Sequence, residues 1–429
     1  MRTAMPEALF RRVRVLFCLA ALAIPAAACA AETAVDGPNE LARVLARTGP
    51  GDVIELAPGR YETRGLRATS SGTADAPIVL RARVPGQTVL ATTGVTLLKI
   101  TGAHWVIEGI DFEGGPDSHH ALHIAGGADA TVVRGNRFRN FHAAIKGNGE
   151  GSPRRFPDGV RIERNVFAND TPRATDAPVT PIDVVGGQGW VVAENVIADF
   201  AKDGGNRVSY AAFLKGGARN GAFLRNLVVC ASRHGGGIRV GLSLGGGGTG
   251  GGVEDPRTPC AAGNCPEAVD MTVAGNIVLH CPGEPGLYLN EAEGALVVGN
   301  TFLGTAGVDA RFPETSARIE NNLIGGRIAR RDGGQAVARG NVVEGGAAGL
   351  GATRVDAWFP GWREGDLTLS AMPPRPPGAP PMPVGARDFC GHPYTDASPP
   401  GAIAGTGRCV VAEELSRRHG PFAPGLPIR

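Results

Sequence analysis

Arg164-Asn165-Val166-Phe167 is one copy of a short motif whose recurrence along the chain decides the fold. In nearly every copy an Asn precedes a strand-like run of residues. The copies are Gly109-Ile110-Asp111-Phe112, Gly135-Asn136-Arg137-Phe138, Arg164-Asn165-Val166-Phe167, Glu194-Asn195-Val196-Ile197, Arg225-Asn226-Leu227-Val228, Gly275-Asn276-Ile277-Val278, Gly299-Asn300-Thr301-Phe302, Asn321-Asn322-Leu323-Ile324 and Gly340-Asn341-Val342-Val343. From Asn136 onward the Asn residues are spaced by 29, 30, 31, 50, 24, 22 and 19 residues. The spacing of 50 fits two coils of about 25 residues or one coil with a long insertion.

A repeat of this length that contains only short strands predicts a parallel β-helix. Periods of about 20–50 residues are typical of solenoids, propellers and arrays, and a propeller blade needs about 40–45. Asn tolerates a left-handed backbone, and stacked Asn amides can hydrogen-bond from coil to coil. A β-sandwich explains Asn in turns but not a motif in register along the chain. We therefore predict an all-β, single-domain right-handed parallel β-helix with coils of about 22–30 residues.

The composition agrees with an all-β repeat protein. The chain has 429 residues, of which 65 are Gly, 42% are hydrophobic and 5% are aromatic. Gly is about twice as frequent as the usual ~7%. The apolar content is high enough to bury a large core, which excludes disorder, collagen and coiled coil as descriptions of the whole chain.

The first thirty residues have the pattern of a secretory signal peptide. Arginines precede an apolar run over residues 15–28, and Ala28-Cys29-Ala30 resembles a cleavage site. A lipoprotein signal at Cys29 is the alternative. Without residues 1–30 the net charge of +2 becomes −1, so the chain lacks the basic surface that nucleic-acid binding needs. No later stretch has the ~18 apolar residues of a transmembrane helix, and we expect a periplasmic or secreted protein.

The remaining chain divides into a cap, the repeats and a tail. We expect an N-terminal cap over residues 31–50, with a short amphipathic helix within 38–48 that covers the open end of the coils. The first strand is expected at 52–56, and the β-helix covers 51–350. Residues 351–429 form a Pro-rich C-terminal tail packed on or beside the helix. No partner protein is indicated, so we expect a monomer.

Six cysteines remain after removal of residues 1–30. An even number of cysteines in an exported chain suggests disulfides. Two of them occupy similar places in two repeats, which favours a bridge between stacked coils. The expected pairs are Cys230–Cys281, Cys260–Cys265 and Cys390–Cys409.

The N-terminal repeats resemble a known group of exported enzymes. The matching segments are Gly51-Asp52-Val53-Ile54-Glu55-Leu56, Gly59-Arg60-Tyr61, Ser71-Gly72-Thr73, Ala76-Pro77-Ile78-Val79-Leu80 and Val106-Ile107-Glu108-Gly109-Ile110-Asp111-Phe112. They are similar to the first coils of right-handed β-helix proteins, above all the chondroitinase B/alginate lyase group (polysaccharide lyase family six). Fold alone does not imply function.

Lysine is rare, and two of the four lysines lie in matching contexts. Ala144-Ile145-Lys146-Gly147 and Phe213-Leu214-Lys215-Gly216 share an apolar-Lys-Gly pattern, and Ile238-Arg239-Val240-Gly241 is a third instance with Arg. The interval between Lys215 and Arg239 is about one coil, so we expect their side chains to stack on one sheet face. Arg311 precedes Asn322 by the same interval as Lys215 precedes Asn226, which places it in the same column. The expected substrate-binding residues along this column are Lys146, Arg311, Asp183, Asn290 and Tyr288; His123 precedes the column.

A column of cations on a long sheet suits an anionic polysaccharide, because guanidinium binds carboxylate bidentately. In β-elimination a base takes the proton next to the uronate carboxylate, and a cation stabilises the charge that develops. A Lys is a base if a neighbouring Arg lowers its pKa. The resembled family uses a Lys and an Arg on successive coils. The resemblance therefore implies β-elimination on a uronate polysaccharide, with Lys215 as base and Arg239 as acid or charge stabiliser.

The segment before Lys215 departs from the calcium-dependent members of that family, which place acidic ligands there. Asn206-Arg207-Val208-Ser209-Tyr210 contains none, so we predict no cofactor and no metal ligands, and Ca²⁺ dependence stays open. The main alternative is a non-catalytic carbohydrate-binding or structural surface β-helix protein, and a hydrolase or epimerase is a third hypothesis. Convergence of Lys215, Arg239 and Arg311 in one groove favours the enzyme, whereas separation or pairing with acids favours the non-catalytic protein.

Overall fold

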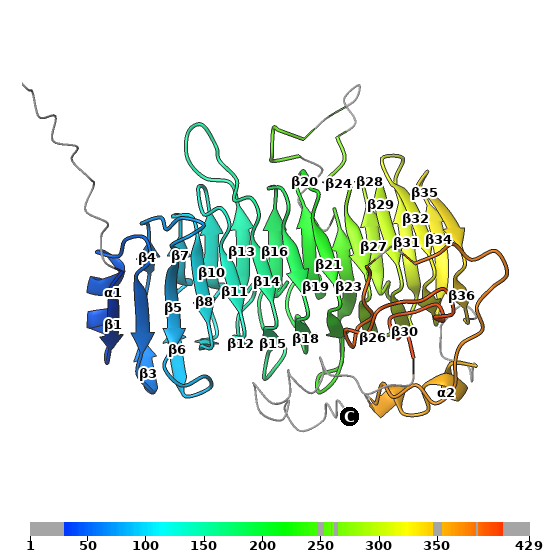
Figure 1. The fold of residues 1–429 in the computed structure, drawn as a ribbon, viewed down its shortest axis with the longest axis horizontal. Coiled ribbons are helices and arrows are strands. Elements are labelled where there is room, and N and C mark those ends of the chain that lie inside the picture. The colour runs from blue at the N-terminus through cyan, green and yellow to red at the C-terminus, as the bar shows by residue number, and fades with distance from the viewer. Residues whose placement is uncertain are drawn as a thin grey trace, which may run out of the picture.

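The computed structural model describes residues 30–246, 253–258, 260, 265–345, 354–364, 366–382 and 385–405. Residues 1–29 of the predicted signal peptide, and Cys409, lie outside this part of the chain. Three long parallel sheets run along one axis, and most circuits of the chain add one strand to each sheet in turn (Figure 1). The predicted parallel β-helix is confirmed.

Sheet A, with twelve strands, precedes the turn that carries the repeated Asn. Its strands are β1 (Glu32–Val35), β2 (Val53–Leu56), β5 (Ile78–Ala82), β8 (Trp105–Glu108), β11 (Val132–Arg134), β14 (Arg161–Glu163), β17 (Val191–Ala193), β21 (Ala222–Leu224), β25 (Thr272–Ala274), β29 (Ala295–Val298), β32 (Ser316–Glu320) and β35 (Gln335–Arg339). The expectation that 52–56 is the first strand is wrong, because β1 comes earlier and pairs with β2.

Sheet B, with eleven strands, follows that turn. Its strands are β3 (Gly59–Glu62), β6 (Thr88–Thr92), β9 (Asp111–Gly114), β12 (Arg137–Arg139), β15 (Val166–Ala168), β18 (Val196–Ala198), β22 (Leu227–Val229), β26 (Ile277–Cys281), β30 (Thr301–Thr305), β33 (Leu323–Ile324) and β36 (Val342–Val343).

Sheet C, with ten strands, completes each coil. Its strands are β4 (Leu66–Ala68), β7 (Thr96–Ile100), β10 (His120–Ala125), β13 (Ile145–Asn148), β16 (Ile182–Val185), β19 (Val208–Lys215), β23 (Ile238–Leu244), β27 (Leu287–Asn290), β31 (Gly307–Arg311) and β34 (Arg327–Arg331). A small three-stranded sheet follows it, made of β20 (Ala218–Arg219), β24 (Ala268–Val269) and β28 (Ala292–Glu293).

The repeated asparagines form a buried ladder at the turn between sheets A and B. Asn165 Nδ2 donates to Asn195 Oδ1 at 3.1 Å, and Asn195 Nδ2 donates to Asn226 Oδ1 at 3.0 Å. The predicted coil-to-coil amide bonds are therefore present. The left-handed backbone, however, lies one residue earlier, at Arg164 (φ 56°) and Glu194 (φ 57°). The Asn supplies hydrogen bonds to the neighbouring coils, and its predecessor makes the turn.

The longest interval between ladder asparagines corresponds to one coil with a long insertion. Asn226 Nδ2 donates directly to Asn276 Oδ1 at 2.9 Å, and β22 pairs with β26. The extra residues leave the stack after β23 and return at β24. They matter for the site because they leave the stack beside Lys215.

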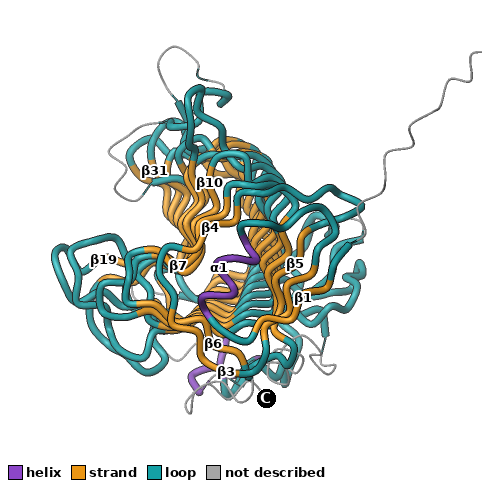
Figure 2. The backbone as a smooth tube through the Cα atoms, turned by 90° about the vertical axis from the view of Figure 1, so that its left-hand side faces the viewer, coloured by secondary structure: helices purple, strands orange, loops and turns teal. Residues whose placement is uncertain are grey.

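Apolar side chains of all three sheets fill the inside of the coils. Phe112, Phe138 and Phe167 stack on one another there, with ring centroids 4.8 Å apart. The predicted capping helix is α1 (Pro38–Leu45), which buries Leu41 and Leu45 and lies across the N-terminal mouth of the coils (Figure 2).

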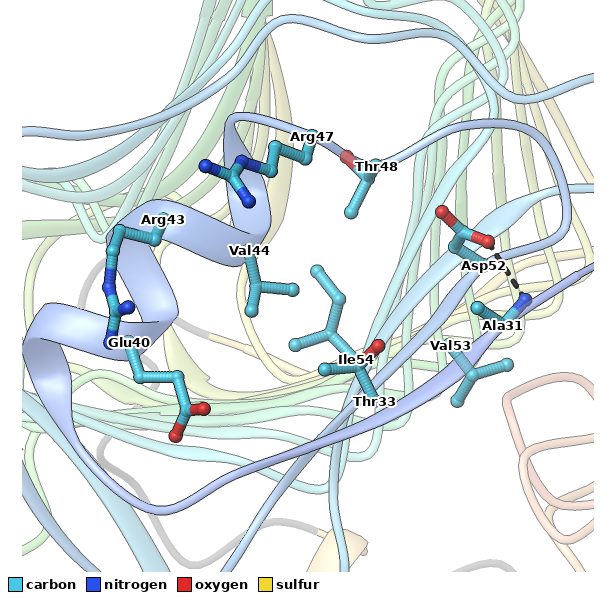
Figure 3. Close-up of a pocket in the computed structure, with 10 residues that line it drawn as sticks. All are labelled: Ala31, Thr33, Glu40, Arg43, Val44, Arg47, Thr48, Asp52, Val53 and Ile54. Atoms are coloured by element: carbon cyan, nitrogen blue, oxygen red, sulfur yellow. Dashed lines mark hydrogen bonds between the residues drawn. The ribbon is translucent and has the colours of Figure 1, made fainter.

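A cavity of about 300 Å³ lies between α1 and the first strands of sheet A. Glu40, Arg43 and Arg47 of the helix segment line it, and the Ala31 N–H donates to Asp52 Oδ1 across the loop at 2.9 Å (Figure 3). This cavity belongs to the cap, because helix and first-strand residues close it.

The C-terminal tail covers the outer face of the later strands of sheet B (Figure 1). It contains α2 (Val355–Trp358) and the 3₁₀ helix η1 (Trp362–Glu364). Trp358 and Phe389 pack against apolar side chains such as Leu227 and Ile277 that point away from the coil interior. From β15 onward sheet B therefore has apolar residues on both faces, whereas its earlier strands carry charged residues such as Arg60 and Glu113 outside. Sheet C keeps an outer face of charged and aromatic residues.

Two of the expected disulfides are present. Cys230–Cys281 joins the ends of adjacent strands of sheet B, and Cys260–Cys265 closes a loop within the insertion. Cys409, the expected partner of Cys390, is outside the described residues. Among the residues that the structure describes, no helix is long and apolar enough to cross a membrane.

Candidate active site

A row of polar and aromatic side chains runs across the outer face of sheet C. The strand register aligns His123 with Lys146 and Lys146 with Asp183. It continues from Asp183 to Phe213, Ser243, Tyr288 and Asp309. The residues on either side of this row, such as Ile145 and Val184, point into the core. Alternation along the strands therefore places the row on the outside of the coils.

Lys146, Asp183 and Lys215 form the lysine cluster, which spans three consecutive coils. Asp183 lies in the middle coil. Its Oδ2 accepts from Lys146 Nζ at 2.8 Å, and its Oδ1 lies 3.7 Å from Lys215 Nζ. Asp183 is 7% exposed and Lys215 is 5% exposed. The structure thus brings together three of the residues that the sequence singled out.

The charges in the lysine cluster perturb one another. Burial lowers the pKa of Lys215, Asp183 partly restores it, and the nearby Lys146 lowers it further. Burial would raise the pKa of Asp183, but the two lysines outweigh burial and hold that pKa below its usual range. The Lys215 ammonium also lies 4.2 Å from the centre of the Phe213 ring. The lowered pKa makes Lys215 give up its proton more readily than an ordinary lysine.

Two histidines of β10 stand beside the lysine cluster. Burial lowers the pKa of His120 to about 4, with His123 and Lys146 adding to the effect. His120 Nδ1 contacts the Ala143 carbonyl at 2.9 Å, which fixes its ring. Burial also lowers the pKa of His123, so both rings are neutral near pH 7. The sequence pattern assigns no role to His123 or to His120 and predicts a surface turn at His120. The interval of about one coil between His123 and Lys146 was the available signal.

Arg239 does not stack with Lys215, and that expectation is wrong. The register pairs Arg239 with Ser209, near the beginning of β19, whereas Lys215 ends that strand. At about 3.3 Å per residue the two positions are about 20 Å apart along the strands. The Arg239 guanidinium donates to the Gly236 carbonyl and is 5% exposed. It belongs to a different region from the lysine cluster.

Arg311, Asn290 and Tyr288 lie on the same face, further toward the C-terminus. Leu214 aligns through Leu244 and Leu289 with Ala310, so the next residues in these strands place Lys215, Asn290 and Arg311 in one column. Arg311 is three coils from Lys215, about 14 Å at ~4.8 Å per strand. Arg311 Nη1 donates to the Tyr288 hydroxyl at 3.0 Å, and its Nε lies 2.6 Å from Asp332.

Two loops form a wall next to the lysine cluster. Arg154, in the loop after β13, pairs with Glu254 of the insertion at 2.8 Å. Arg257 of the insertion pairs with Asp158 at 2.7 Å. The Glu254 backbone N–H donates to the Gly216 carbonyl, directly after Lys215. The insertion therefore limits access to Lys215 from this side.

The residues around Lys215 do not fit a calcium ion. Calcium takes six to eight oxygen ligands, whereas the single carboxylate in the lysine cluster, Asp183, already faces two ammonium groups. Within the described residues one trio of potential metal ligands meets, Asp388, Cys390 and His392 in the tail. Cys390 is disulfide-bonded, and the Asp388 carboxylate accepts backbone N–H groups of His392 and Ala404. This trio is part of the tail's own structure.

The fold and this outer face define a parallel β-helix protein with a charged sheet surface. The family model described as Chondroitinase B matches residues 35–195, less than half of the chain. The chain is thus similar to the chondroitinase B group over its N-terminal coils, the cap and the first part of the lysine cluster included. No curated protein matches the chain at a significant level.

Solved structures support the fold. Pectate lyase Pel9A is 12% identical with a TM-score of 0.51, and the match covers 87% of this chain and 96% of that one. The GH136 lacto-N-biosidase from Eubacterium ramulus is 11% identical with a TM-score of 0.51, covering 73% and 67%. A PL6 family polysaccharide lyase from Pseudopedobacter saltans is 13% identical with a TM-score of 0.39, covering 72% and 92%. Proteins of different activities share this fold, so the activity must be argued from the site.

Proposed function

We propose that this protein is an exported polysaccharide lyase-like enzyme that cleaves a uronate-containing polysaccharide by β-elimination at the lysine cluster. The observation that carries the proposal is the buried Lys215, which shares Asp183 with Lys146 on the outer face of sheet C. The match of residues 35–195 to the Chondroitinase B family model supports the same class of reaction. Two disulfides suit an oxidising compartment, periplasmic or extracellular.

In this proposal Lys215 is the base. Its unprotonated amine takes the proton from the carbon next to the substrate carboxylate. The electron pair forms a double bond to the neighbouring carbon as the bond from that carbon to the glycosidic oxygen breaks, and the leaving oxygen takes a proton from water. Lys146, which is charged and paired with Asp183, stabilises the negative charge that builds on the carboxylate. Lys146 thereby replaces Arg239 in the role of charge stabiliser. The neutral His120 and His123 are placed to hydrogen-bond sugar hydroxyls.

A non-catalytic carbohydrate-binding β-helix is the second candidate. The observation that favours it is the pairing of the cations: Lys215 with Asp183 and Arg311 with Asp332. Arg239 is also remote from both. In this case the same outer face binds an anionic polysaccharide without breaking it.

Ultraviolet absorbance of unsaturated uronate products distinguishes the two candidates. Purified protein lacking residues 1–30 is incubated with alginate, pectate, chondroitin and heparin-like polymers, with and without calcium. Lys215→Met keeps the volume of the side chain and leaves Asp183 paired with Lys146, and we expect it to lower the rate by about 10²–10⁴, as for loss of a general base. Lys99→Met, on β7 of the same sheet, is the matched control, because Lys99 pairs with Glu150 outside the lysine cluster.

The outcomes are separate. A product signal that persists in Lys215→Met would leave a lyase with a different base. Absence of product on every polymer would exclude the lyase and leave the binding protein as the better description.

A further inference from the structure

A second cavity, of about 460 Å³, opens on the outer face of sheet C toward its C-terminal end. The first residues of β19 and β23 form one wall. β19 begins in a part of the chain that projects from the side of the coils (Figure 2). The floor is formed by β27, β31 and β34, and the turn at residues 283–285 closes one edge. Its volume lies within the range of about 300–1,000 Å³ typical of sites for small ligands.

The cavity adjoins the lysine cluster. Tyr210, in its wall, packs on Phe213 with ring centroids 4.3 Å apart, and Phe213 lies under the Lys215 ammonium. Tyr288 of the floor is in the same row of sheet C as Asp183, three coils away. At ~4.8 Å per coil this separation is about 14 Å, which a chain of a few sugar units can bridge.

The lining offers the two kinds of contact that a sugar makes, an apolar surface and hydrogen-bond donors. Ile238, 41% exposed, and Val208 give an apolar surface for one face of a sugar ring. Tyr288 accepts a hydrogen bond from Arg311 and keeps its own hydroxyl proton to donate. Burial, with Tyr288 and Glu284 nearby, raises the pKa of Tyr210 to about 12, so this hydroxyl also remains a donor.

Among the described residues that line the cavity, one arginine, Arg327, has no carboxylate partner. Asp309 is paired with Arg331, whose Nε lies 3.0 Å from Oδ2. Burial raises the pKa of Glu284, and within the described residues its carboxyl group makes no ion pair with an arginine of the cavity. Within the described residues Arg327 makes no side-chain hydrogen bond or ion pair, although it lines the cavity. A carboxylate on the ligand would complete this arrangement.

We infer that this cavity binds one acidic sugar unit of the polysaccharide that occupies the lysine cluster, with its carboxylate on Arg327 and its hydroxyls on Tyr210 and Tyr288. The inference rests on the proposed function for the identity of the polymer. It adds a binding subsite whose residues are distinct from the lysine cluster.

The test is calorimetric binding of long alginate and pectate oligosaccharides in the Lys215→Met background, where turnover is blocked. We expect Arg327→Ala to raise the Kd about tenfold or more, the effect of losing one charge-assisted hydrogen bond. Tyr288→Phe should raise it by a smaller factor. Arg318→Ala is the matched control, because Arg318 is an exposed arginine on β32 of sheet A and should leave the Kd unchanged. Carboxyl-reduced pectate should bind wild type and Arg327→Ala equally.

The outcomes separate this inference from the proposed function. Binding that depends on Arg327, together with no unsaturated product from the protein with Lys215 intact, would overturn the lyase and keep the subsite. A lyase whose Kd is the same in Arg327→Ala and Arg318→Ala would overturn the subsite and keep the lyase. No binding of either polymer would overturn the subsite. Equal affinity of the Lys215→Met protein for pectate and carboxyl-reduced pectate would overturn the acidic-sugar assignment.

Discussion

Replacing Asp183 by Asn tests whether this carboxylate is the shared counter-ion of the two lysines. The substitution keeps the shape of the side chain and removes its charge. Among the described residues Lys215, with 6% of its side chain exposed, then has no anion in ion-pair contact, whereas Lys146 keeps 21% exposure and partial hydration. Most of the destabilisation should therefore come from Lys215.

Two costs set the size of this destabilisation: that of leaving a buried charge unpaired and that of removing the proton from Lys215. Removing one partner of a buried ion pair costs about 3–5 kcal/mol. The protein can avoid a larger cost by releasing the Lys215 proton, which for a lysine of ordinary pKa ~10.4 costs about 4.6 kcal/mol at pH 7 and about 1.9 kcal/mol at pH 9. We expect Asp183→Asn to lower the free energy of unfolding by about 3–4 kcal/mol at pH 7, and by about 2 kcal/mol or less at pH 9.

The sign of the pH dependence is set by the lowered pKa of Lys215. Between its folded and unfolded pKa values the unfolded chain binds more protons, so the free energy of unfolding rises with pH in that window. Loss of the Asp183 charge lowers the folded pKa of Lys215 further and extends the window toward neutral pH. Recovery of stability on raising the pH is therefore specific to a buried, unpaired amine.

Urea unfolding followed by circular dichroism at pH 7 and about pH 9 measures the effect. The double variant Asp183→Asn/Lys215→Met has no buried amine to neutralise, and it should be more stable than Asp183→Asn at pH 7 with little pH dependence. A destabilisation by Asp183→Asn that is equal at both pH values, or that Lys215→Met does not relieve, would refute the assignment of Asp183 as counter-ion.

Three further predictions concern the scaffold. Asn226→Ala should lower the free energy of unfolding by about 3 kcal/mol or more in urea, because it removes four buried hydrogen bonds. Asn341→Ala, at the end of the ladder, should cost less than half as much. Replacing Cys230 and Cys281 together by Ser should cost about 2–4 kcal/mol and abolish most of the effect of reductant on thermal unfolding. Burial lowers the pKa of His142 to about 4, so the free energy of unfolding should fall as the pH drops from about 6.5 toward 4. The His142→Gln variant should lose less stability than the wild type over this range, when unfolding is measured at both pH values.

The fold was predictable because the asparagine that joins neighbouring coils recurs in the sequence. The ladder asparagines need a buried amide at the same corner of each coil, so the residue type recurs whatever the turns elsewhere do. The capping helix was predictable because Leu41, Val44 and Leu45 recur at helical spacing, and the structure buries Leu41 and Leu45. The strand β1 was missed because Glu32–Val35 is short and mostly exposed, and its pairing with β2 is what makes it a strand.

The site was only partly predictable, because residue spacing is not strand register in a solenoid with insertions. Lys215 and Arg311 precede their ladder asparagines by the same interval, and they do share a column. Arg239 lies much further ahead of Asn276, since the long insertion falls between them. Counting back from the ladder gives the observed register for Lys215 and Arg311, but it fails in a coil whose sheet C strand is followed by an insertion. The pairing of Lys146 and Lys215 with one aspartate depends on side-chain reach across three coils, which no spacing reveals.

The charge of the lysine cluster bears on what the outer face of sheet C does. A purely structural ion pair is neutral, because an unbalanced buried charge is costly. Here two ammonium groups face one carboxylate at ion-pair distance. The acids next nearest to Lys215 are engaged elsewhere: Glu254 with Arg154, and Glu267 with the Gly246 N–H. While Lys215 is protonated, the excess positive charge of the cluster, like Arg327 in the neighbouring cavity, fits an anionic ligand. Both candidate functions require that ligand, and they differ only in whether Lys215 accepts a proton from it.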